Sequence, residues 1–129
     1  MPAEAIFNND EIKVFELLNS GDTDRINAFL GLYEKFFPKY AHYTPRMRRR
    51  TQLPSEARAG HKVHYWLIEH QDIPIGLFMF RYISHRQCGA GTALALDPSV
   101  RTVSINGKSL TEFMFEKVLN QLKEDALSA

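Results

Sequence analysis

The sequence has little of several features that define whole classes of protein. Its 129 residues include one cysteine, Cys88, so no internal disulfide can form, which agrees with a reducing compartment. The longest apolar runs, such as IPIGLFMF from Ile73 to Phe80, are far shorter than the ~20 residues of a membrane-spanning helix. The N-terminus has no basic segment followed by an apolar stretch, as a secretory signal would. We therefore expect a cytoplasmic protein that does not span a membrane.

A strong charge of one sign is also missing. The formal net charge is +1, so the chain as a whole does not resemble a polyanion binder. One basic run stands out, TPRMRRRTQ, which contains Arg46, Arg48, Arg49 and Arg50. Guanidinium groups suit an acidic acceptor, a coenzyme phosphate or nucleic acid, and the alternative is a solvated basic loop balanced by acidic neighbours. Because the chain is nearly neutral, we favour the solvated loop and do not expect nucleic acid as a partner.

The patterns of metal sites and cysteine enzymes are missing as well. His64 and His70 lie six residues apart on one face of an expected strand, ~20 Å at ~3.3 Å per residue, which is too far to share an ion. His61 and His64 would point to opposite faces, and one cysteine gives no zinc pattern. No base can be inferred beside Cys88, so we expect a turn residue rather than a nucleophile. We expect no metal.

The residues that are present favour one folded domain over 1–129, with 44% hydrophobic and 24% charged residues. The composition of Ile12 to Asn19 favours a short strand. The segment TDRINAFLGLYEKFF then places apolar residues at steps of three and four, which predicts a helix with Asp22 or Thr23 as N-cap and Pro38 as its end.

The rest of the chain predicts an irregular segment, three strands and a second long helix. The segment 39–60 has two prolines and no sustained period, which indicates a loop with a short helix around Ser55 to Ala59. Three strand-like runs follow at 62–70, 73–84 and 88–97, joined by short polar turns as in an antiparallel meander. The final helix has one apolar stripe, formed by Leu110, Phe113, Met114, Val118, Leu122 and Ala126.

Two motifs and the order of the elements resemble a known family. IPIGLFMF is similar to the entry into the third strand of the GCN5-related N-acetyltransferases, and LALDPSVR is similar to the strand, Asp, Pro and Arg before their coenzyme loop. The order strand, helix, irregular segment or short helix, three strands and helix resembles the N-terminal part of that family over about Ile12 to Ala126. The resemblance implies a three-layer α+β fold with a mostly antiparallel mixed sheet.

The resemblance also implies a function and partners. It implies an acetyl-CoA-dependent N-acetyltransferase, with acetyl-CoA or another acyl-CoA as co-substrate and a small-molecule or peptide amine as acceptor. Family members continue with further strands, whereas this sequence ends at Ala129. We therefore expect either a fragment of a longer protein or a sheet completed by a second chain, as in a homodimer. The alternative is a non-catalytic domain of the same fold that serves in dimerisation or partner binding.

The coenzyme loop that the resemblance implies lies between the last strand and the last helix. GKS at 107–109 ends like a triphosphate-binding loop, but Thr102 stands where that motif needs glycine. In the family, backbone N–H groups of the loop surround the coenzyme pyrophosphate. Here the resemblance implies that role for Val103, Ser104, Ile105, Asn106 and Gly107, with added charge from Arg101 and Lys108 and main-chain contacts to the pantetheine arm from Leu94 and Leu96.

This loop departs from the family pattern, because Ser104 and Asn106 stand where two small glycines are expected. Their side chains can obstruct the approach of an anion, although Asn tolerates a positive φ and Gly107 follows. The alternative is a polar turn in which Asn106 or Ser109 caps the helix.

Three side chains are candidates to accept the proton of the attacking amine. Glu69, His85 and Asp97 lie on or near the strands expected on the acceptor side, and each can take up a proton. For each of them, a solvated position at the end of a strand is the alternative.

Overall fold

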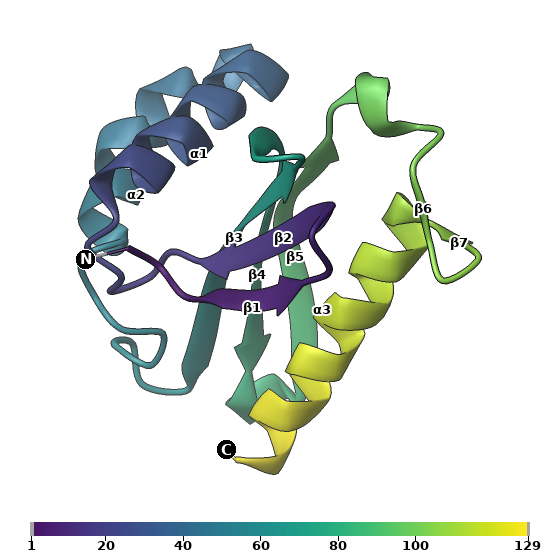
Figure 1. Cartoon of the computed structure of the whole chain (residues 1–129). Coiled ribbons are helices and arrows are strands. Elements are labelled where there is room, and N and C mark those ends of the chain that lie inside the picture. The colour runs from purple at the N-terminus through teal and green to yellow at the C-terminus, as the bar shows by residue number, and fades with distance from the viewer. Residues whose placement is uncertain (1, 129) are drawn as a thin grey trace.

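The computed structural model describes residues 2–128, and their sheet has five strands that are all antiparallel. The strands are β1 (Ala5–Asn8), β2 (Ile12–Glu16), β3 (His61–His70), β4 (Ile73–Ile83) and β5 (Cys88–Leu96), and they lie in that order across the sheet (Figure 1). The predicted meander is confirmed. The first predicted strand is confirmed only as far as Glu16, and β1 was not predicted.

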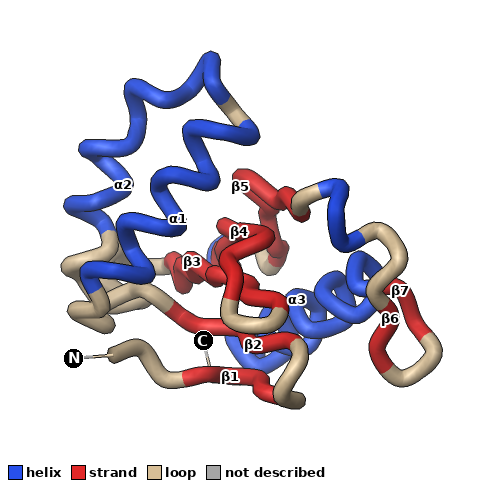
Figure 2. Tube along the Cα trace, turned by 45° about the horizontal axis from the view of Figure 1, so that its top comes forward, coloured by secondary structure: helices blue, strands red, loops and turns tan. Residues whose placement is uncertain are grey.

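The helices cover both faces of the sheet. Helix α1 (Thr23–Phe36) begins at Asp22, whose carboxylate accepts a hydrogen bond from the Arg25 N–H at 3.2 Å, as an N-cap does. The 3-10 helix η1 (Pro38–Tyr43) and helix α2 (Thr44–Arg50) follow, and α3 (Leu110–Leu127) is the last element. Helices α1 and α2 lie on one face and α3 on the other (Figures 1 and 2), so the fold has three layers. No helix within residues 2–128 is long and apolar enough to cross a bilayer.

The alternation of side chains along the strands divides the core in two. Phe78 and Phe80 of β4 face α3 and pack with Met114, whereas Leu77 and Met79 face the other way. Each half is apolar at its centre, so both faces of the sheet must be covered. Because residues on both faces of the strands are apolar, polar and apolar side chains hardly alternate along them, and the sheet lies between helices.

Three details of the helices differ from the sequence predictions. The short helix expected at 55–59 is wrong: turns occupy this segment, and Ser55 is fixed to Val63 by a hydrogen bond from Ser55 Oγ to the Val63 carbonyl at 2.7 Å. The arginine run, expected in a loop, instead forms α2. In α3, Ala126 is exposed and Asp125 is buried, because a buried histidine described below binds the Asp125 carboxylate.

The segment between β5 and α3 contains a small hairpin. After the 3-10 helix η3 (Pro98–Val100), strands β6 (Ser104–Ile105) and β7 (Lys108–Ser109) pair with each other. Asn106 and Gly107 form the turn, with φ of 52° and 79°. A two-residue turn with positive φ at both positions is what Asn-Gly favours. The backbone of this loop therefore forms a polar turn, which was the alternative to a coenzyme loop.

Candidate functional site

A cavity of about 290 Å³ lies between the end of β5, η3 and the beginning of α3. Its apolar wall includes Phe78 of β4 and Phe115 of α3, together with Leu94 and Leu96. Polar groups line the other side, where Arg101 follows η3 and Thr111 lies in the first turn of α3. The cavity therefore combines an apolar wall with a few convergent polar groups, as small-molecule sites do.

The free edge of β5 borders this cavity. Within the described chain β5 pairs only with β4, so every second residue of β5 directs its N–H and C=O away from the sheet. Met79 pairs with Ala93 and Phe80 with Gly91, which leaves Thr92 as an extra residue in β5. This is a β-bulge, a feature that recurs beside active sites because it frees main-chain groups and redirects a side chain.

The beginning of α3 supplies part of the polar side. Ser109 is the N-cap, and its hydroxyl accepts a hydrogen bond from the Glu112 N–H at 3.2 Å. The Leu110 N–H donates to the Val103 carbonyl at 3.1 Å. The N–H of Thr111, between these two, has no partner within residues 2–128 and adjoins the cavity. A helix N-terminus with a free N–H attracts an anion through the helix dipole.

Of the nine predicted coenzyme-binding residues, Leu94, Leu96 and Arg101 line this cavity. The others belong to the hairpin and its approach: Val103, Ser104, Ile105, Asn106, Gly107 and Lys108. Ile105 is 4% exposed and packs in the core, and the Lys108 ammonium forms an ion pair with Glu116. The hairpin therefore takes the place of a continuous loop of N–H groups at the start of the helix.

The three candidate bases do not meet at one point. Asp97 borders the cavity, but its carboxylate accepts hydrogen bonds from the Ser99 N–H at 2.9 Å and from Lys35 Nζ at 3.0 Å. These contacts lower the pKa of Asp97 to about 2. His85 is exposed and lies in η2 (Ser84–Arg86), at the opposite end of β4 and β5.

Glu69 lies at the same end of the sheet as Asp97, but on β3. Its carboxylate is buried and accepts a hydrogen bond from Arg25 Nε at 3.0 Å. Arg25 also binds the Asp22 carboxylate at 2.9 Å and lies over the Phe15 ring. The ion pair ties β3 to α1, which gives Glu69 a structural role in this arrangement.

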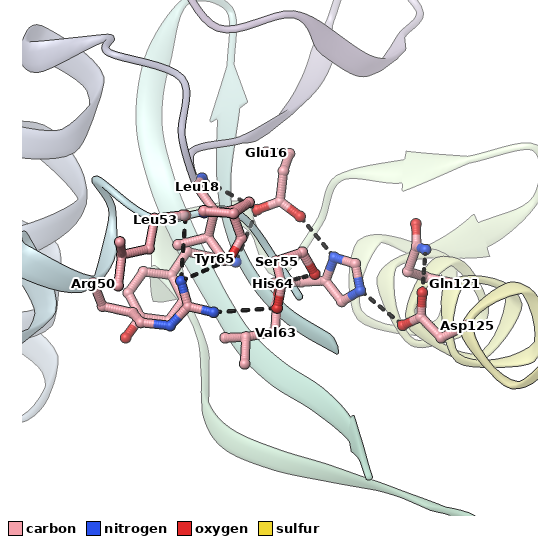
Figure 3. Close-up of polar contacts among 11 residues, drawn as sticks. Glu16, Leu18, Arg50, Leu53, Ser55, Val63, His64, Tyr65, Gln121 and Asp125 are labelled. Atoms are coloured by element: carbon pink, nitrogen blue, oxygen red, sulfur yellow. Dashed lines mark hydrogen bonds and ion pairs between the residues drawn. The ribbon is translucent and has the colours of Figure 1, made fainter. Parts of the chain in front are cut away.

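Sequence reasoning missed a buried polar network around His64 of β3 (Figure 3). His64 Nδ1 lies 2.6 Å from Glu16 Oε1 of β2, and its Nε2 lies 2.7 Å from Asp125 Oδ2 of α3. Gln121 Nε2 donates to the other Asp125 oxygen at 3.0 Å. The partners are 48 and 61 residues away in the sequence, so no local pattern indicated them.

No cluster of three or more His, Cys, Asp or Glu side chains within residues 2–128 is arranged to hold a metal ion. Cys88, for which sequence analysis favoured a turn, is the first residue of β5 and is exposed. Comparison with known proteins found no matching family model, no matching curated protein and no matching solved structure. We therefore infer a function from the residues of the cavity and their chemistry.

Proposed function

We propose that this chain is an acyl-CoA-dependent N-acyltransferase and that the cavity between β5 and α3 receives the coenzyme. The observation that carries the proposal is the combination at one cavity of a free strand edge, an apolar wall, Arg101 and the beginning of α3. Each of these features matches one part of an acyl-CoA molecule. The expected order of elements from the first strand to the last helix, with the helices on both faces, agrees with this proposal.

The pantetheine arm carries two amide groups on a largely apolar chain. The outward-facing main-chain groups of Leu94 and Leu96 can form a strand-like ladder with such amides, as extended ligands do at a sheet edge. Phe115, which is 44% exposed, offers apolar surface beside that edge. A ligand would therefore bury apolar surface that the chain leaves in contact with solvent.

The pyrophosphate needs positive charge and N–H donors. Arg101 provides a guanidinium fork on an exposed side chain, and the free N–H of Thr111 adds a donor at the positive end of the α3 dipole. Asn106 and Gly107 form the turn of the hairpin and do not line the cavity, so we assign the pyrophosphate to Arg101 and Thr111, which do.

Transfer requires an amine placed against the thioester, a donor for the carbonyl oxygen and a way to remove a proton. The bulge at Thr92 supplies unpaired main-chain groups on the same edge strand, about 7 Å along β5 from Leu94 at ~3.3 Å per residue. Asp97, with its pKa of about 2, is a weak base at neutral pH. We therefore assign Asp97 a positioning role and propose that the neutral amine attacks the thioester carbonyl. The amide C–N bond then forms as the C–S bond breaks, and the proton of the amine passes to the departing CoA thiolate.

The hairpin of β6 and β7 favours one alternative, that the chain is a non-catalytic domain that binds a partner. Asn106 and Gly107 are used in a turn and Lys108 is paired, so the pyrophosphate site has fewer donors than a glycine-rich loop would offer.

Titration calorimetry with acetyl-CoA and then with pantetheine separates the two functions. The acyltransferase proposal predicts saturable binding of acetyl-CoA, weaker binding of pantetheine, and release of free CoA thiol when amines are added. Absence of heat with both ligands would leave the partner-binding domain as the better account.

A further inference from the structure

A second cavity, of about 620 Å³, lies on the opposite face of the sheet, under α2 and the segment 53–58. Its volume is in the range of small-molecule sites, about 300–1,000 Å³. The walls carry three tyrosines, Tyr33, Tyr43 and Tyr65, and several aliphatic side chains. Its charged lining consists of arginines alone, with no carboxylate among the lining residues.

Four arginines from three separate segments meet at this cavity. Arg46 and Arg50 come from α2, Arg58 from the following loop, and Arg81 from β4. Within residues 2–128, neither Arg46, Arg58 nor Arg81 forms an ion pair with a carboxylate, whereas Arg25 and three lysines do. The charges of this cavity are therefore not neutralised by the protein's own acids.

Arg50 has a different role, which fixes the shape of the cavity. Its guanidinium donates to the main-chain carbonyls of Leu53, Pro54 and Ser55 at 3.0 to 3.3 Å (Figure 3). Ser55 is in turn bonded to Val63 of β3. These contacts hold the segment that carries Arg58 against the sheet, so the arginines occupy a preorganised wall rather than a free loop.

The floor of the cavity offers hydroxyl groups without partners. Tyr33 and Tyr65 are 8% and 7% exposed, and neither hydroxyl forms a hydrogen bond with another residue of the described chain. Burial raises the pKa of Tyr65, while the charges of Arg50, Arg81 and Arg46 act in the opposite direction, because these guanidinium groups lie close to the phenol. Neutral hydroxyl donors beside three cations form a complementary surface for an oxyanion.

We propose that this cavity binds a small organic anion, whose carboxylate or phosphate is held by Arg46, Arg58 and Arg81 and whose apolar part lies against Tyr33 and Tyr65. Like charges that converge without a counter-ion destabilise a fold, and an anion removes that repulsion. The proposal stands without the acyltransferase. Thr92 adjoins this cavity and belongs to the same edge strand as Leu94. If acyl transfer also occurs, we therefore expect the acceptor to be an amine that also carries an acidic group.

Binding of benzoate, phenyl phosphate and neutral benzamide tests the proposal, measured by NMR titration and thermal shift without coenzyme. We expect benzoate or phenyl phosphate to bind saturably and to raise the Tm, whereas benzamide should not bind. The anion that binds more tightly identifies the acidic group of the ligand as a carboxylate or a phosphate. Arg46→Gln should weaken binding at least about tenfold, as loss of a charge-assisted hydrogen bond does. Tyr65→Phe should weaken it by a smaller factor.

Arg49→Gln is the matched control, because Arg49 belongs to the same helix but does not line the cavity. It should leave anion binding unchanged, and Arg46→Gln should keep or raise the Tm of the free protein, since it removes an unpaired cation. Equal binding of benzamide, or no saturable binding of either anion to a folded protein, would overturn the proposal. Tight binding of single-stranded DNA that Arg49→Gln weakens as much as Arg46→Gln would also overturn it, and would assign these arginines to a nucleic-acid surface.

Discussion

His64 Nε2 lies 2.7 Å from Asp125 Oδ2, so one hydrogen bond joins the third strand of the sheet to the last turns of α3. Glu16 binds the other ring nitrogen, and an imidazole can donate to two carboxylates only when it is protonated. Burial disfavours the charged ring, but the hydrogen bonds and charges of Glu16 and Asp125 outweigh it and raise the pKa of His64. The network therefore favours the cationic histidine in the folded state.

The first prediction is a pH-dependent stability. A group whose pKa is raised by folding stabilises the fold fully below its unfolded pKa, about 6.5 for histidine, and loses that effect as the pH rises through the folded value. We expect the free energy of unfolding in urea to fall as the pH increases above about 6.5. His64→Gln should be less stable and should lack this fall. An unchanged slope in His64→Gln would assign the pH dependence to other groups.

The second prediction concerns Asp125, which is 5% exposed. Removing one member of a buried charged pair leaves the other uncompensated, so Asp125→Leu should destabilise the fold by about 3 kcal/mol. Glu124→Leu, at an exposed neighbouring position of α3, is the control and should change stability by less than about 0.5 kcal/mol. Chemical denaturation of both variants measures the difference. Equal stability of the two would mean that the contact with His64 contributes nothing.

The third prediction separates structure from catalysis at Glu69. Because its carboxylate binds Arg25 at 3.0 Å, Glu69→Gln should lower stability by about 1–2 kcal/mol. Acyl transfer, measured at a temperature where the variant is folded, should change less than about threefold. If stability stayed constant while turnover was lost, Glu69 would be the base expected from the sequence.

The fourth prediction concerns the Asn106–Gly107 turn. Asn106→Gly should leave coenzyme binding unchanged, because the backbone at φ of 52° suits both residues and the turn lies outside the cavity. Asn106→Val should cost about 1–3 kcal/mol of stability, since a β-branched residue is strained at positive φ. Calorimetry and thermal unfolding measure the two effects. Stronger coenzyme binding by Asn106→Gly would instead support a pyrophosphate loop at this position.

Much of the fold followed from local periodicity. Apolar residues at helical spacing predicted α1 and α3, and β-rich runs between polar turns predicted β3, β4 and β5. Strand β1 was missed because its four residues are mostly exposed and carry no alternation. Helix α2 was missed because its sequence is dominated by arginine and only Met47 is buried, so it has no apolar stripe.

The candidate sites depended more on tertiary contacts. The resemblance to the acetyltransferase family implied Leu94, Leu96 and Arg101 as coenzyme-binding residues, and all three line the cavity between β5 and α3. The partners of His64 and the convergence of Arg46, Arg58 and Arg81 could not be predicted, since these residues come together only when the sheet and α2 are packed. Asp97 was predicted as a candidate base, but its pKa is lowered by the hydrogen bond from the Ser99 N–H and then by that from Lys35, which is 62 residues away.

Coenzyme binding by one arginine variant and one lysine variant tests the central proposal most directly. Arg101 lines the cavity, whereas Lys108 lies on the hairpin and is paired with Glu116. We expect CoA to bind the unmodified protein, Arg101→Gln to bind it at least about tenfold more weakly, and Lys108→Gln to bind it as the unmodified protein does. Absence of saturable binding to the unmodified protein, or equal affinity of all three proteins, would contradict the proposed coenzyme site.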